Sequence, residues 1–346
     1  MKIDFWTRYS ELGASSRLRF FQFVPLLAQY GCEVKCFPFF DDSYLNKLYS
    51  GKRRFLPEIA GYYRRRRKQL AAAGPDTPAV IEYELLPFMP YFMEAGFLKK
   101  RKYVLNFDDA VDLHYEKIPV LKNKYPALIA SAAGIITAND MLLEKFSRFN
   151  RNTVKLPTIP PAAIVPGAED AKSGKLTLVW TGTPITYRFL LEKASVLRQA
   201  AEKTPFQLLI VGGDPAQKLA GVDCQYIPWS EKAEADALSR SHAGIMPLPD
   251  TPFTRGKSAY KLLCYLRAGI PGIASPVGEN TRVIRHGENG FLADSDQSWI
   301  DAISRLADAE TRKNLSAAAL ADGQNYLPGH AAEKMAEFFK HCFNIG

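Results

Sequence analysis

Two adjacent carboxylates are the residues of this sequence that are best placed to do chemistry. Asp108 and Asp109 directly follow the β-type run YVLNF, and Asp112 and His114 come close behind them. Carboxylates at the end of a strand can act as catalytic groups, bind a substrate hydroxyl or ligate a metal, although Asp is also a favoured helix cap. One cap needs one Asp, so the adjacent pair favours a functional site.

A loop near the N-terminus has the composition of an anion-binding site. Small residues, among them Gly13 and Ser16, separate the strand-like run IDFWT from a helix expected over residues 16–30, and Arg17 lies in its first turn. Helix N-termini offer free N–H groups to anions, and a cation in the first turn opposes the helix dipole. We therefore expect this loop to bind an anionic ligand. It lacks the GxGxxG pattern, which disfavours an NAD enzyme.

Glycines also end two strand-like runs in the second half of the chain. Gly182 and Thr183 follow LTLVWT, and Gly212 and Gly213 follow FQLLIV. Glycine allows a backbone to approach a phosphate or a sugar closely. Because glycines end many parallel strands, either loop alone is weak evidence of a binding site.

The strongest pattern lies in the segment from residue 247 to residue 278. It contains four residues that are expected to open a helix: Gly256, Lys257, Ser258 and Ala259. Lys257 and Lys261 would then share one side of the helix, where like charges cost stability unless an anion lies between them. The helix N-terminus and the two lysines predict a diphosphate cradle. The run GKS is not a P-loop, because position 251 is Thr rather than Gly.

Short apolar runs alternate with helical patterns along the whole chain, which predicts α/β architecture with doubly wound parallel sheets. The alternation restarts after residues 155–175, a segment rich in Pro, Ala and Gly that is typical of an interdomain linker. We expect one Rossmann-like domain over residues 1–157, a second over 158–325, and a C-terminal helix over 326–346 that packs back toward the first. Ligands of such sheets bind at the carboxyl ends of the strands, where these loops lie.

The composition excludes several classes of protein. The 346 residues are 47% hydrophobic and 23% charged, as in a folded globular protein. The five cysteines form no CxxC pair, which argues against a disulfide framework and a structural zinc site. The opening MKIDFWTRYSELG lacks the apolar core of a signal peptide, so we expect a cytoplasmic protein.

The positive charge is concentrated in the first half of the chain. Residues 1–160 contain 25 Lys and Arg against 16 Asp and Glu, whereas residues 161–346 contain 20 of each. This asymmetry predicts an anionic partner: nucleic acid, an acidic membrane surface or a phosphorylated substrate. The densest run of cations is Arg64, Arg65, Arg66, Arg67 and Lys68. It lacks the interleaved aromatics of a nucleic-acid stacking platform, so we expect an anionic membrane surface and no nucleic acid. The same run could bind a diphosphate-linked acceptor directly, and the sequence does not separate these two roles.

The sequence resembles bacterial glycosyltransferases of family 4, which have the GT-B arrangement of two facing Rossmann-like domains. The similar motifs run through nearly the whole chain and include GASSRLR, LNFDDAVDL, GIITANDMLLEKF, LPTIP and LVWTGTP. The most specific is GKSAYKLLCYLRAGIPGIASPVGENTRVIRHGENGFLA, which starts at residue 256. The resemblance implies a retaining hexosyltransferase (EC 2.4) that uses a nucleotide-sugar as co-substrate and needs no metal or other cofactor.

The resemblance also implies roles for individual residues. Asp108 and Asp109 match the position beside the transferred sugar, and the first half, with Gly13, Ser16 and Arg17, would meet the acceptor or its phosphate. The positions that match donor-binding loops are Gly182, Thr183, Gly212, Gly213, Gly256, Lys257, Ser258 and Ala259. Two glutamates that many members of the family carry are replaced here by Gly256 and Cys264. Members also usually have a basic residue after the first strand of the second domain, and Arg188 is the only nearby candidate here. Lys257 and Lys261 would supply the positive charge instead.

These expectations describe an enzyme of cell-surface polysaccharide or glycolipid synthesis that acts on a glycan or lipid-linked acceptor at the inner face of the membrane. Two other interpretations remain open. One is a nucleic-acid- or anion-binding protein that uses the basic first half of the chain. The other is a nucleotide-sugar epimerase on the same fold, although the second half lacks the crowded carboxylates and His that this chemistry would need.

Overall fold

The computed structural model describes residues 1–50, 56–74, 76–168 and 174–344. The chain forms two compact units. Unit 1 comprises Met1–Ile159, Gly256–Ser258 and Pro328–Gly346, and unit 2 comprises Pro160–Arg255 and Ala259–Leu327. The chain thus first passes from unit 1 to unit 2 after residue 159, and the sequence predicts this boundary after residue 157. Residues 169–173 of the predicted linker lie outside the described residues.

Unit 1 is built on a parallel sheet with the order β2-β1-β3-β4-β5-β6 within the described residues. Its strands are β1 (Lys2–Tyr9), β2 (Glu33–Phe40), β3 (Ala79–Glu82), β4 (Tyr103–Phe107), β5 (Gly134–Thr137) and β6 (Thr153–Lys155). Strands such as AVIE and YVLNF are buried along their whole length, as expected for a parallel sheet covered on both faces. The strand order reverses between β1 and β3, and doubly wound sheets bind ligands at the carboxyl ends of strands beside such a reversal.

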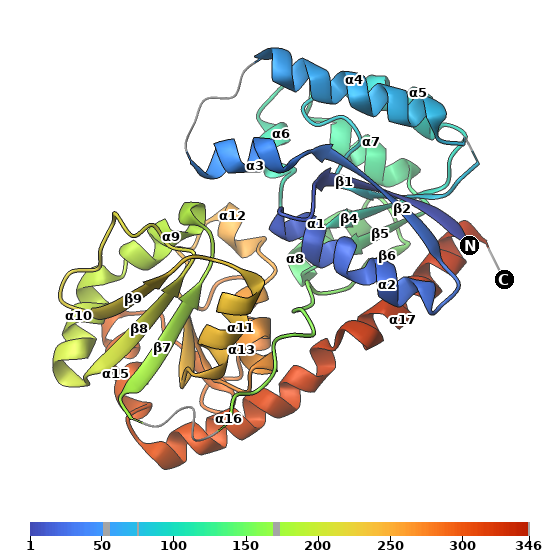
Figure 1. Cartoon of the computed structure of the whole chain (residues 1–346). Helices are drawn as coiled ribbons and strands as arrows, with labels where there is room; N and C mark the ends of the chain where they lie inside the picture. Colours follow the sequence, from blue (N-terminus) through green and yellow to red (C-terminus); the bar gives the residue numbers. More distant parts are fainter. Residues whose placement is uncertain (51–55, 75, 169–173, 345–346) are drawn as a thin grey trace. The chain divides into compact units, whose positions relative to one another are not determined.

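Helices cover both faces of this sheet (Figure 1). They are α1 (Ala14–Arg19), η1 (Phe21–Phe23), α2 (Val24–Ala28), α3 (Asp42–Tyr49), α4 (Leu56–Ala72), α5 (Phe92–Leu98), α6 (Leu113–Glu116), α7 (Lys124–Ser131), α8 (Asp140–Ser147) and α17 (Pro328–Phe343). The single helix expected over residues 16–30 is wrong, because α1 ends at Arg19 and two short helices follow. Pro25 lies in the first turn of α2, where its missing N–H costs no hydrogen bond but where it cannot continue a preceding helix.

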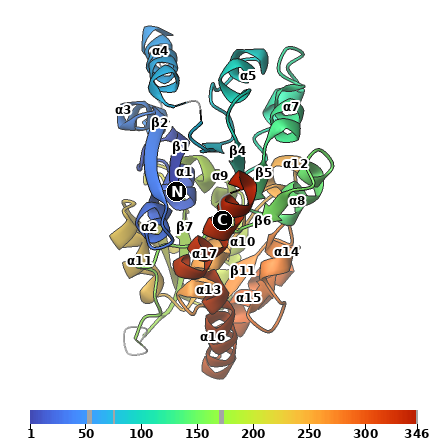
Figure 2. The ribbon, with the colours of Figure 1, turned by 90° about the vertical axis from the view of Figure 1, so that its right-hand side faces the viewer.

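The C-terminal helix α17 is part of unit 1. It lies against α2, as Figure 2 shows, and the Phe339 ring meets the Phe5 ring edge-on with centroids 6.2 Å apart. Gly134 of β5 lets the helix come close, since a Cβ there would lie 2.5 Å from Cys342 Sγ. Residues from β1, β5 and α17 thus share one buried face of the sheet.

Unit 2 has the strand order β12-β11-β10-β7-β8-β9, which is that of a dinucleotide-binding Rossmann sheet. Its strands are β7 (Leu176–Thr181), β8 (Phe206–Val211), β9 (Asp223–Ile227), β10 (Ala243–Met246), β11 (Gly272–Ala274) and β12 (Gly290–Leu292). The order reverses between β7 and β10. The loops after these two strands are the ones with the candidate donor-binding residues.

The helices of unit 2 alternate with its strands and follow them to residue 326. They are α9 (Pro184–Leu191), α10 (Ala194–Lys203), α11 (Glu231–Ser239), α12 (Pro252–Arg255), α13 (Tyr260–Arg267), α14 (Asn280–Val283), α15 (Asp296–Arg305), α16 (Ala309–Gly323) and η3 (Gln324–Tyr326). The helix expected to open at residues 256–259 begins only at Tyr260. Ala259 precedes it with a left-handed φ of 52°, which interrupts helical geometry.

Candidate active site

The carboxyl ends of β3 and β4 place several polar side chains together in unit 1. The two strands pair in register, with Glu82 opposite Asn106, and Asp108 follows directly after the end of β4. Because in-register neighbours of a parallel sheet project to the same face, Glu82 and Asn106 lie on one side of the sheet. Arg19 of α1 covers that side and donates from Nε to Asn106 Oδ1 over 2.8 Å.

Asp108 is the more strongly perturbed of the two predicted catalytic residues. The Tyr83 hydroxyl donates to Asp108 Oδ1. Burial raises the pKa of Asp108 to about 6, and the negative charge of Asp109 adds to the rise, whereas Tyr83 and Arg19 oppose it. A carboxylate with such a pKa can carry a charge at neutral pH yet gain a proton in mild acid.

Asp109 forms an ion pair within unit 1. Lys257 Nζ lies 3.3 Å from Asp109 Oδ2, and residues Gly256–Ser258 belong to this unit. Asn139 donates to the Gly256 carbonyl over 2.7 Å, and a Cβ at Gly256 would lie 2.5 Å from the Cβ of Ala110. One predicted donor-binding loop and the predicted catalytic pair are therefore neighbours, and Gly256 is a glycine because a larger residue would collide with Ala110.

The structure adds a residue that sequence reasoning missed. Glu82 is 1% exposed and accepts hydrogen bonds at Oε2 from the Arg8 backbone N–H over 2.7 Å and from the Ser16 hydroxyl. Burial raises the pKa of Glu82 to about 7; the Ser16 bond opposes this rise and the charge of Asp108 adds to it. A charged residue that ends an otherwise apolar strand, as in AVIE, is the signal that could have found it.

The residues of the predicted N-terminal anion site already have contacts within the protein. Its helix α1 has only six residues, too few for a strong dipole. Arg17 donates to the carbonyls of Glu11 and Leu12 over 3.0 and 3.3 Å, and the Ser16 hydroxyl is engaged by Glu82. Gly13 is required by packing, since a Cβ would lie 2.4 Å from that of Tyr9. The three residues thus brace the turn after β1.

The glycines after β7 and β8 pack against each other in unit 2. A Cβ on Gly212, which has a φ of +77°, would lie 2.2 Å from the carbonyl oxygen of Gly182. A Cβ on Gly213 would lie 2.5 Å from Ile210 Cγ2, and one on Gly182 would lie 2.6 Å from the Trp180 ring. These contacts account for all three glycines structurally, and they bring the two loops together at one edge of the sheet.

Thr183 and Arg188, the other two predicted donor-binding residues after β7, lie in helix α9 or at its start. Thr183 caps α9 in a capping box with Thr186, so the first turn of this helix begins at the end of β7. Arg188 is exposed, with its guanidinium carbon 4.8 Å from the centre of the Phe189 ring. Arg188 is therefore a surface cation in the second turn of α9.

Lys257 and Lys261 were expected to share one side of a helix, but in the structure they do not. Lys257 precedes α13, whereas Lys261 lies in its first turn with its Nζ 5.4 Å from the centre of the Trp180 ring. Ser258 and Ala259 between them are buried. Nearby, Glu234 accepts from the Thr181 hydroxyl over 2.6 Å, which adds a second buried carboxylate that the sequence did not single out.

The cation run on α4 is only partly exposed, which corrects its assignment as a five-cation membrane face. Arg66 is 1% exposed, donates to the carbonyls of Phe37 and Thr7 over 2.9 and 3.0 Å, and stacks over Trp6. Arg65 donates to the Phe39 carbonyl over 2.7 Å. A 17-residue helix must turn one side to the protein, so consecutive arginines cannot all face solvent.

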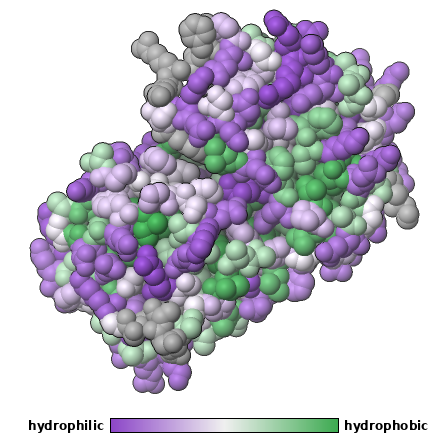
Figure 3. All heavy atoms as spheres, in the orientation of Figure 1, coloured by the Kyte–Doolittle hydropathy of each residue, from purple (hydrophilic) through white to green (hydrophobic). Residues whose placement is uncertain are grey.

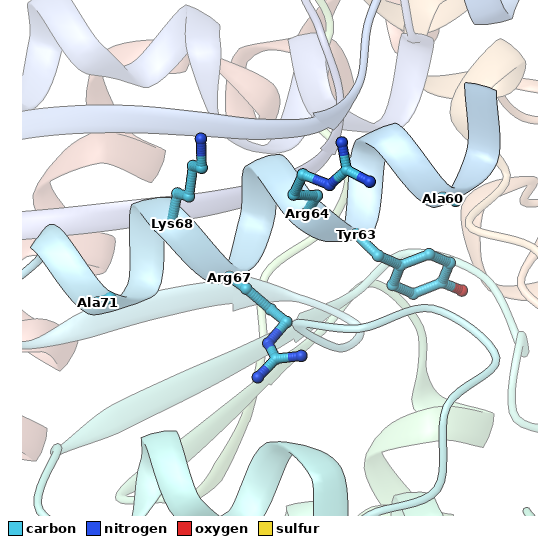
Figure 4. Close-up of a pocket in the computed structure, with 6 residues that line it drawn as sticks. All are labelled: Ala60, Tyr63, Arg64, Arg67, Lys68 and Ala71. Carbon is cyan, nitrogen blue, oxygen red and sulfur yellow. The ribbon is translucent and has the colours of Figure 1, made fainter. Parts of the chain in front are cut away.

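The exposed remainder forms what we call the α4 cation face: Arg64, Arg67 and Lys68. These side chains line a shallow hollow together with Ala60, Tyr63 and Ala71. Figure 4 shows Lys68 and Arg67 extending to opposite sides of the helix, and Figure 3 shows hydrophilic side chains gathered over α4. The Tyr63 hydroxyl donates to the Pro87 carbonyl, which ties the helix to the loop after β3.

Two features are absent from the described residues, a membrane-spanning helix and a cluster of metal ligands. No helix in this part of the chain is long and apolar enough to cross a bilayer. Nor do three or more His, Cys, Asp or Glu side chains gather there in a group that could hold a metal ion.

Comparison with known proteins decides the fold. Residues 176–309 match the family described as Glycosyl transferases group 1. Sucrose-phosphate synthase from Thermosynechococcus elongatus is 16% identical over 100% of both chains, with a TM-score of 0.72. The fold is GT-B.

Other solved structures agree with this assignment. HepE from Anabaena, solved with UDP, is 14% identical over 98% of this chain and 100% of its own, with a TM-score of 0.72. A glycosyltransferase from Rickettsia africae is 12% identical over 100% of this chain and 99% of its own, with a TM-score of 0.66. A search of curated proteins returned no match for this chain.

Proposed function

We propose that this protein is a retaining glycosyltransferase that moves a hexosyl group from a nucleotide-sugar to an acceptor. The observation that carries the proposal is the match of residues 176–309 to group 1 glycosyltransferases. This segment includes the loops after β7 and β10, at the edge where a Rossmann sheet with this strand order binds nucleotides. The GT-B fold of unit 1 and unit 2 supports the same activity.

The donor that we propose is a UDP-hexose. Solved structures of HepE hold UDP and UDP-glucose, and HepE covers nearly the whole of this chain. In unit 2 the loop with Gly182 and Thr183 and the first turn of α13 with Lys261 would contact the nucleotide diphosphate. Arg188 adds an exposed cation at the same edge.

The side chains have properties that suit glycosyl transfer. Cleavage of the bond between the sugar and the phosphate develops negative charge on the diphosphate and positive charge on the sugar ring. Fixed cations such as Lys257 and Lys261 would stabilise the leaving group, which is often worth several kcal/mol. The Asp108 carboxylate would stabilise the charge on the ring or hold a hydroxyl of the sugar, and Tyr83 would fix its orientation.

Unit 1 would receive a lipid-linked acceptor at an anionic membrane surface in the synthesis of a cell-surface polysaccharide or glycolipid. The α4 cation face supplies three exposed positive charges. The loop after β3 and helix α5 expose Phe88 and Phe92, at 53% and 74%, and such aromatic side chains insert readily at a membrane interface. Charge attraction and aromatic insertion together favour an acidic lipid surface over a purely soluble partner.

Thermal-shift measurements with UDP, GDP and ADP, each also as its glucose conjugate, test the donor. A nucleotide that binds the folded state raises the melting temperature, by an amount that grows with the ratio of its concentration to Kd. We expect UDP and UDP-glucose to raise it and ADP to leave it unchanged. Transfer of labelled glucose from UDP-glucose to a membrane extract, with NMR of the anomeric proton of the product, then tests retention. The proposal fails if no nucleotide shifts the melting temperature and no label is transferred, and release of an epimerised sugar nucleotide would instead indicate an epimerase.

A further inference from the structure

A cavity in unit 1 is lined by Asp112, an aspartate after β4 that the proposed function does not use. The volume of the cavity is about 160 Å³, and helices α6, α7 and α8 each contribute side chains to its walls. Asp112 immediately precedes α6 and is 4% exposed. All of the lining residues belong to unit 1, so the cavity is complete within one unit.

Asp112 has one carboxyl oxygen that is bonded and one that is not. Its Oδ2 accepts a hydrogen bond from Lys145, and Lys145 also donates to Glu116 Oε1 over 2.7 Å. Oδ1 is buried, and within the described part of the chain it has no hydrogen-bond partner. Buried polar atoms are almost always paired, so an unpaired carboxyl oxygen of a cavity wall indicates that a bound group completes its hydrogen bonding.

The charged side chains that line the cavity balance one another. Asp112 and Glu116 carry two negative charges, and Lys122 and Lys145 carry two positive charges. The wall therefore offers both acceptors and donors without a net charge that would attract an ion. A hydroxyl group both donates and accepts hydrogen bonds, so a neutral ligand with several hydroxyls matches this wall.

Aromatic side chains form another part of the wall. The rings of Tyr115 and Tyr125 meet edge-on at an angle of 65°, with centroids 4.9 Å apart. Phe149 also lines the cavity and is 46% exposed, so its ring lies at the open side. The face of an aromatic ring carries partial negative charge, which attracts the C–H groups of a sugar ring. Aromatic rings beside hydrogen-bonding groups therefore suit a sugar better than a small ion.

The size and the place of the cavity narrow the choice of ligand. Pockets for drug-sized ligands have volumes of about 300–1,000 Å³, so a cavity of about 160 Å³ suits a single sugar ring and is too small for a nucleotide-sugar. The match to group 1 glycosyltransferases covers residues 176–309, which excludes every residue of this wall. The cavity is thus separate from the proposed donor site.

We propose that this cavity binds a hexose residue of the acceptor, with a sugar hydroxyl donating to Asp112 Oδ1 and a C–H face of the ring against the aromatic wall. The proposal rests on the proposed glycosyltransferase function for the identification of the sugar as part of the acceptor. Asp112 would hold a sugar that does not itself react, since the candidate catalytic carboxylate is Asp108. The cavity would then favour acceptors with more than one sugar residue.

Methyl NMR tests the site without any assay of transfer. The ¹³C-labelled δ1 methyl group of Ile129, which lines the cavity, is followed during addition of methyl α-glucoside, methyl α-galactoside, N-acetylglucosamine or inorganic phosphate. Excess UDP is present throughout, so that the sugars do not enter the proposed donor site. We expect at least one of the three sugars to shift the Ile129 signal and phosphate to leave it in place.

Variants then connect the signal to the wall of the cavity. Asp112→Ala removes an acceptor and should weaken binding of that sugar by roughly tenfold or more. Phe149→Ala removes an aromatic face and should weaken it by about threefold or more. The matched controls are Glu144→Ala and Val165→Ala, which remove an exposed carboxylate and an exposed apolar side chain that do not line the cavity, and they should bind like the wild type. If Asp112→Ala does not fold, Phe149→Ala decides, because its ring is already half-exposed.

The proposal is overturned if no sugar moves the Ile129 signal, if phosphate alone moves it, or if the folded variants of Asp112 and Phe149 bind the sugar as tightly as the wild type. In transfer assays, Phe149→Ala should raise KM for the acceptor and leave kcat and the KM for UDP-glucose unchanged. Absence of transfer in the wild type would instead contradict the proposed function. The NMR titration would still decide whether the cavity binds a sugar.

Discussion

Asp108 combines partial exposure to solvent with an environment that shifts its charge state. The Tyr83 hydroxyl orients one carboxyl oxygen, and burial together with Asp109 raises the pKa of Asp108 to about 6. Asp109 has the opposite situation, since its negative charge is paired with Lys257 at 3.3 Å. The two adjacent aspartates therefore differ in their surroundings. Asp108 changes its protonation near pH 6, whereas Asp109 forms an ion pair with Lys257.

Substitution of Asp108 should change both the rate and its pH dependence. Because the carboxylate is the useful form, protonation below about pH 6 should lower kcat/KM of the wild type. Asp108→Asn should lower kcat by about 100-fold or more and abolish this acidic limb. Steady-state kinetics across the pH range check this, with Glu144→Gln as a control that removes an exposed carboxylate of α8. A wild-type profile that is flat through pH 6 would argue against a catalytic Asp108.

Lys257 and Lys261 should each contribute to transfer, but from different positions. Loss of one charged hydrogen bond to a diphosphate costs about 1.5–3 kcal/mol, which is roughly a tenfold to hundredfold loss of kcat/KM. Lys257→Ala also frees Asp109, so it should affect the pH profile, whereas Lys261→Ala should not. Lys232→Ala, an exposed lysine of α11, is the matched control. Wild-type kinetics in both variants would mean that the phosphates bind elsewhere.

For single residues, the sequence identifies candidate site residues more reliably than it predicts their contacts. Asp108, Asp109 and Gly256 were found because a strand end or a motif marks them. Ser16 and Arg17 were singled out as anion ligands, and the structure shows contacts that the sequence did not predict, in which both side chains brace a turn. Glu82 was missed because its partners lie 66 and 74 residues away, and no local pattern records such contacts.

Helix α4 illustrates how an element sorts a run of identical residues. Its period of 3.6 residues turns Arg66 inward while Arg64, Arg67 and Lys68 face outward. Arg66 remains charged because burial lowers its pKa only to about 9, and it binds two backbone carbonyls of strands β2 and β1. The same run therefore supplies two cations bonded to strand carbonyls, Arg65 and Arg66, and three surface cations.

The two kinds of arginine should differ sharply in stability measurements. Arg66→Ala leaves two carbonyls unpaired and a gap over Trp6, so it should lower the free energy of unfolding by about 3 kcal/mol. Arg64→Ala should change it by less than about 0.5 kcal/mol, as for most surface positions. Urea unfolding followed by circular dichroism measures both. Equal effects of the two variants would show that the inward position of Arg66 is wrong.

Elements with continuous apolar runs were predictable, and irregular ones were not. Runs such as YVLNF and FQLLIV are strands because a sheet covered on both faces buries all or nearly all of their side chains. The helix expected over residues 16–30 is broken at Phe20, and α13 starts after Ala259. These breaks depend on the backbone conformation of single residues and on tertiary contacts, which hydrophobic periodicity does not report.

For the whole molecule, we expect glycosyl transfer to continue in the presence of EDTA. The aspartates of unit 1 are engaged as anchors of other side chains, Asp108 by Tyr83 and Asp109 by Lys257. Lysines at the proposed diphosphate site would replace the charge that a divalent cation supplies in other enzymes. Transfer assays after chelation, with and without added Mg²⁺ or Mn²⁺, check this. Activity that is lost and then restored by a metal would assign the aspartates a ligand role.

The asymmetry of charge between the two halves leads to a prediction about membranes. All of the excess positive charge lies in residues 1–160, and the α4 cation face exposes three of these cations. Each basic residue near an acidic leaflet contributes on the order of 1 kcal/mol, so this face alone would give weak binding that aromatic side chains such as Phe92 strengthen. We therefore expect binding to anionic but not to neutral vesicles, and loss of binding at high salt.

Sedimentation with phosphatidylserine and phosphatidylcholine vesicles at low and high salt measures this binding. The triple variant Arg64→Ser, Arg67→Ser and Lys68→Ser should bind anionic vesicles at least about tenfold more weakly, because up to about 3 kcal/mol of attraction is removed. The control variant removes three exposed lysines of unit 2: Lys218, Lys232 and Lys313. Because both variants lose the same net charge, a nonspecific effect of net charge would weaken the vesicle binding of both equally. Selective loss in the α4 variant places the membrane contact on unit 1, whereas a wild type that ignores anionic vesicles at low salt would favour a soluble acceptor.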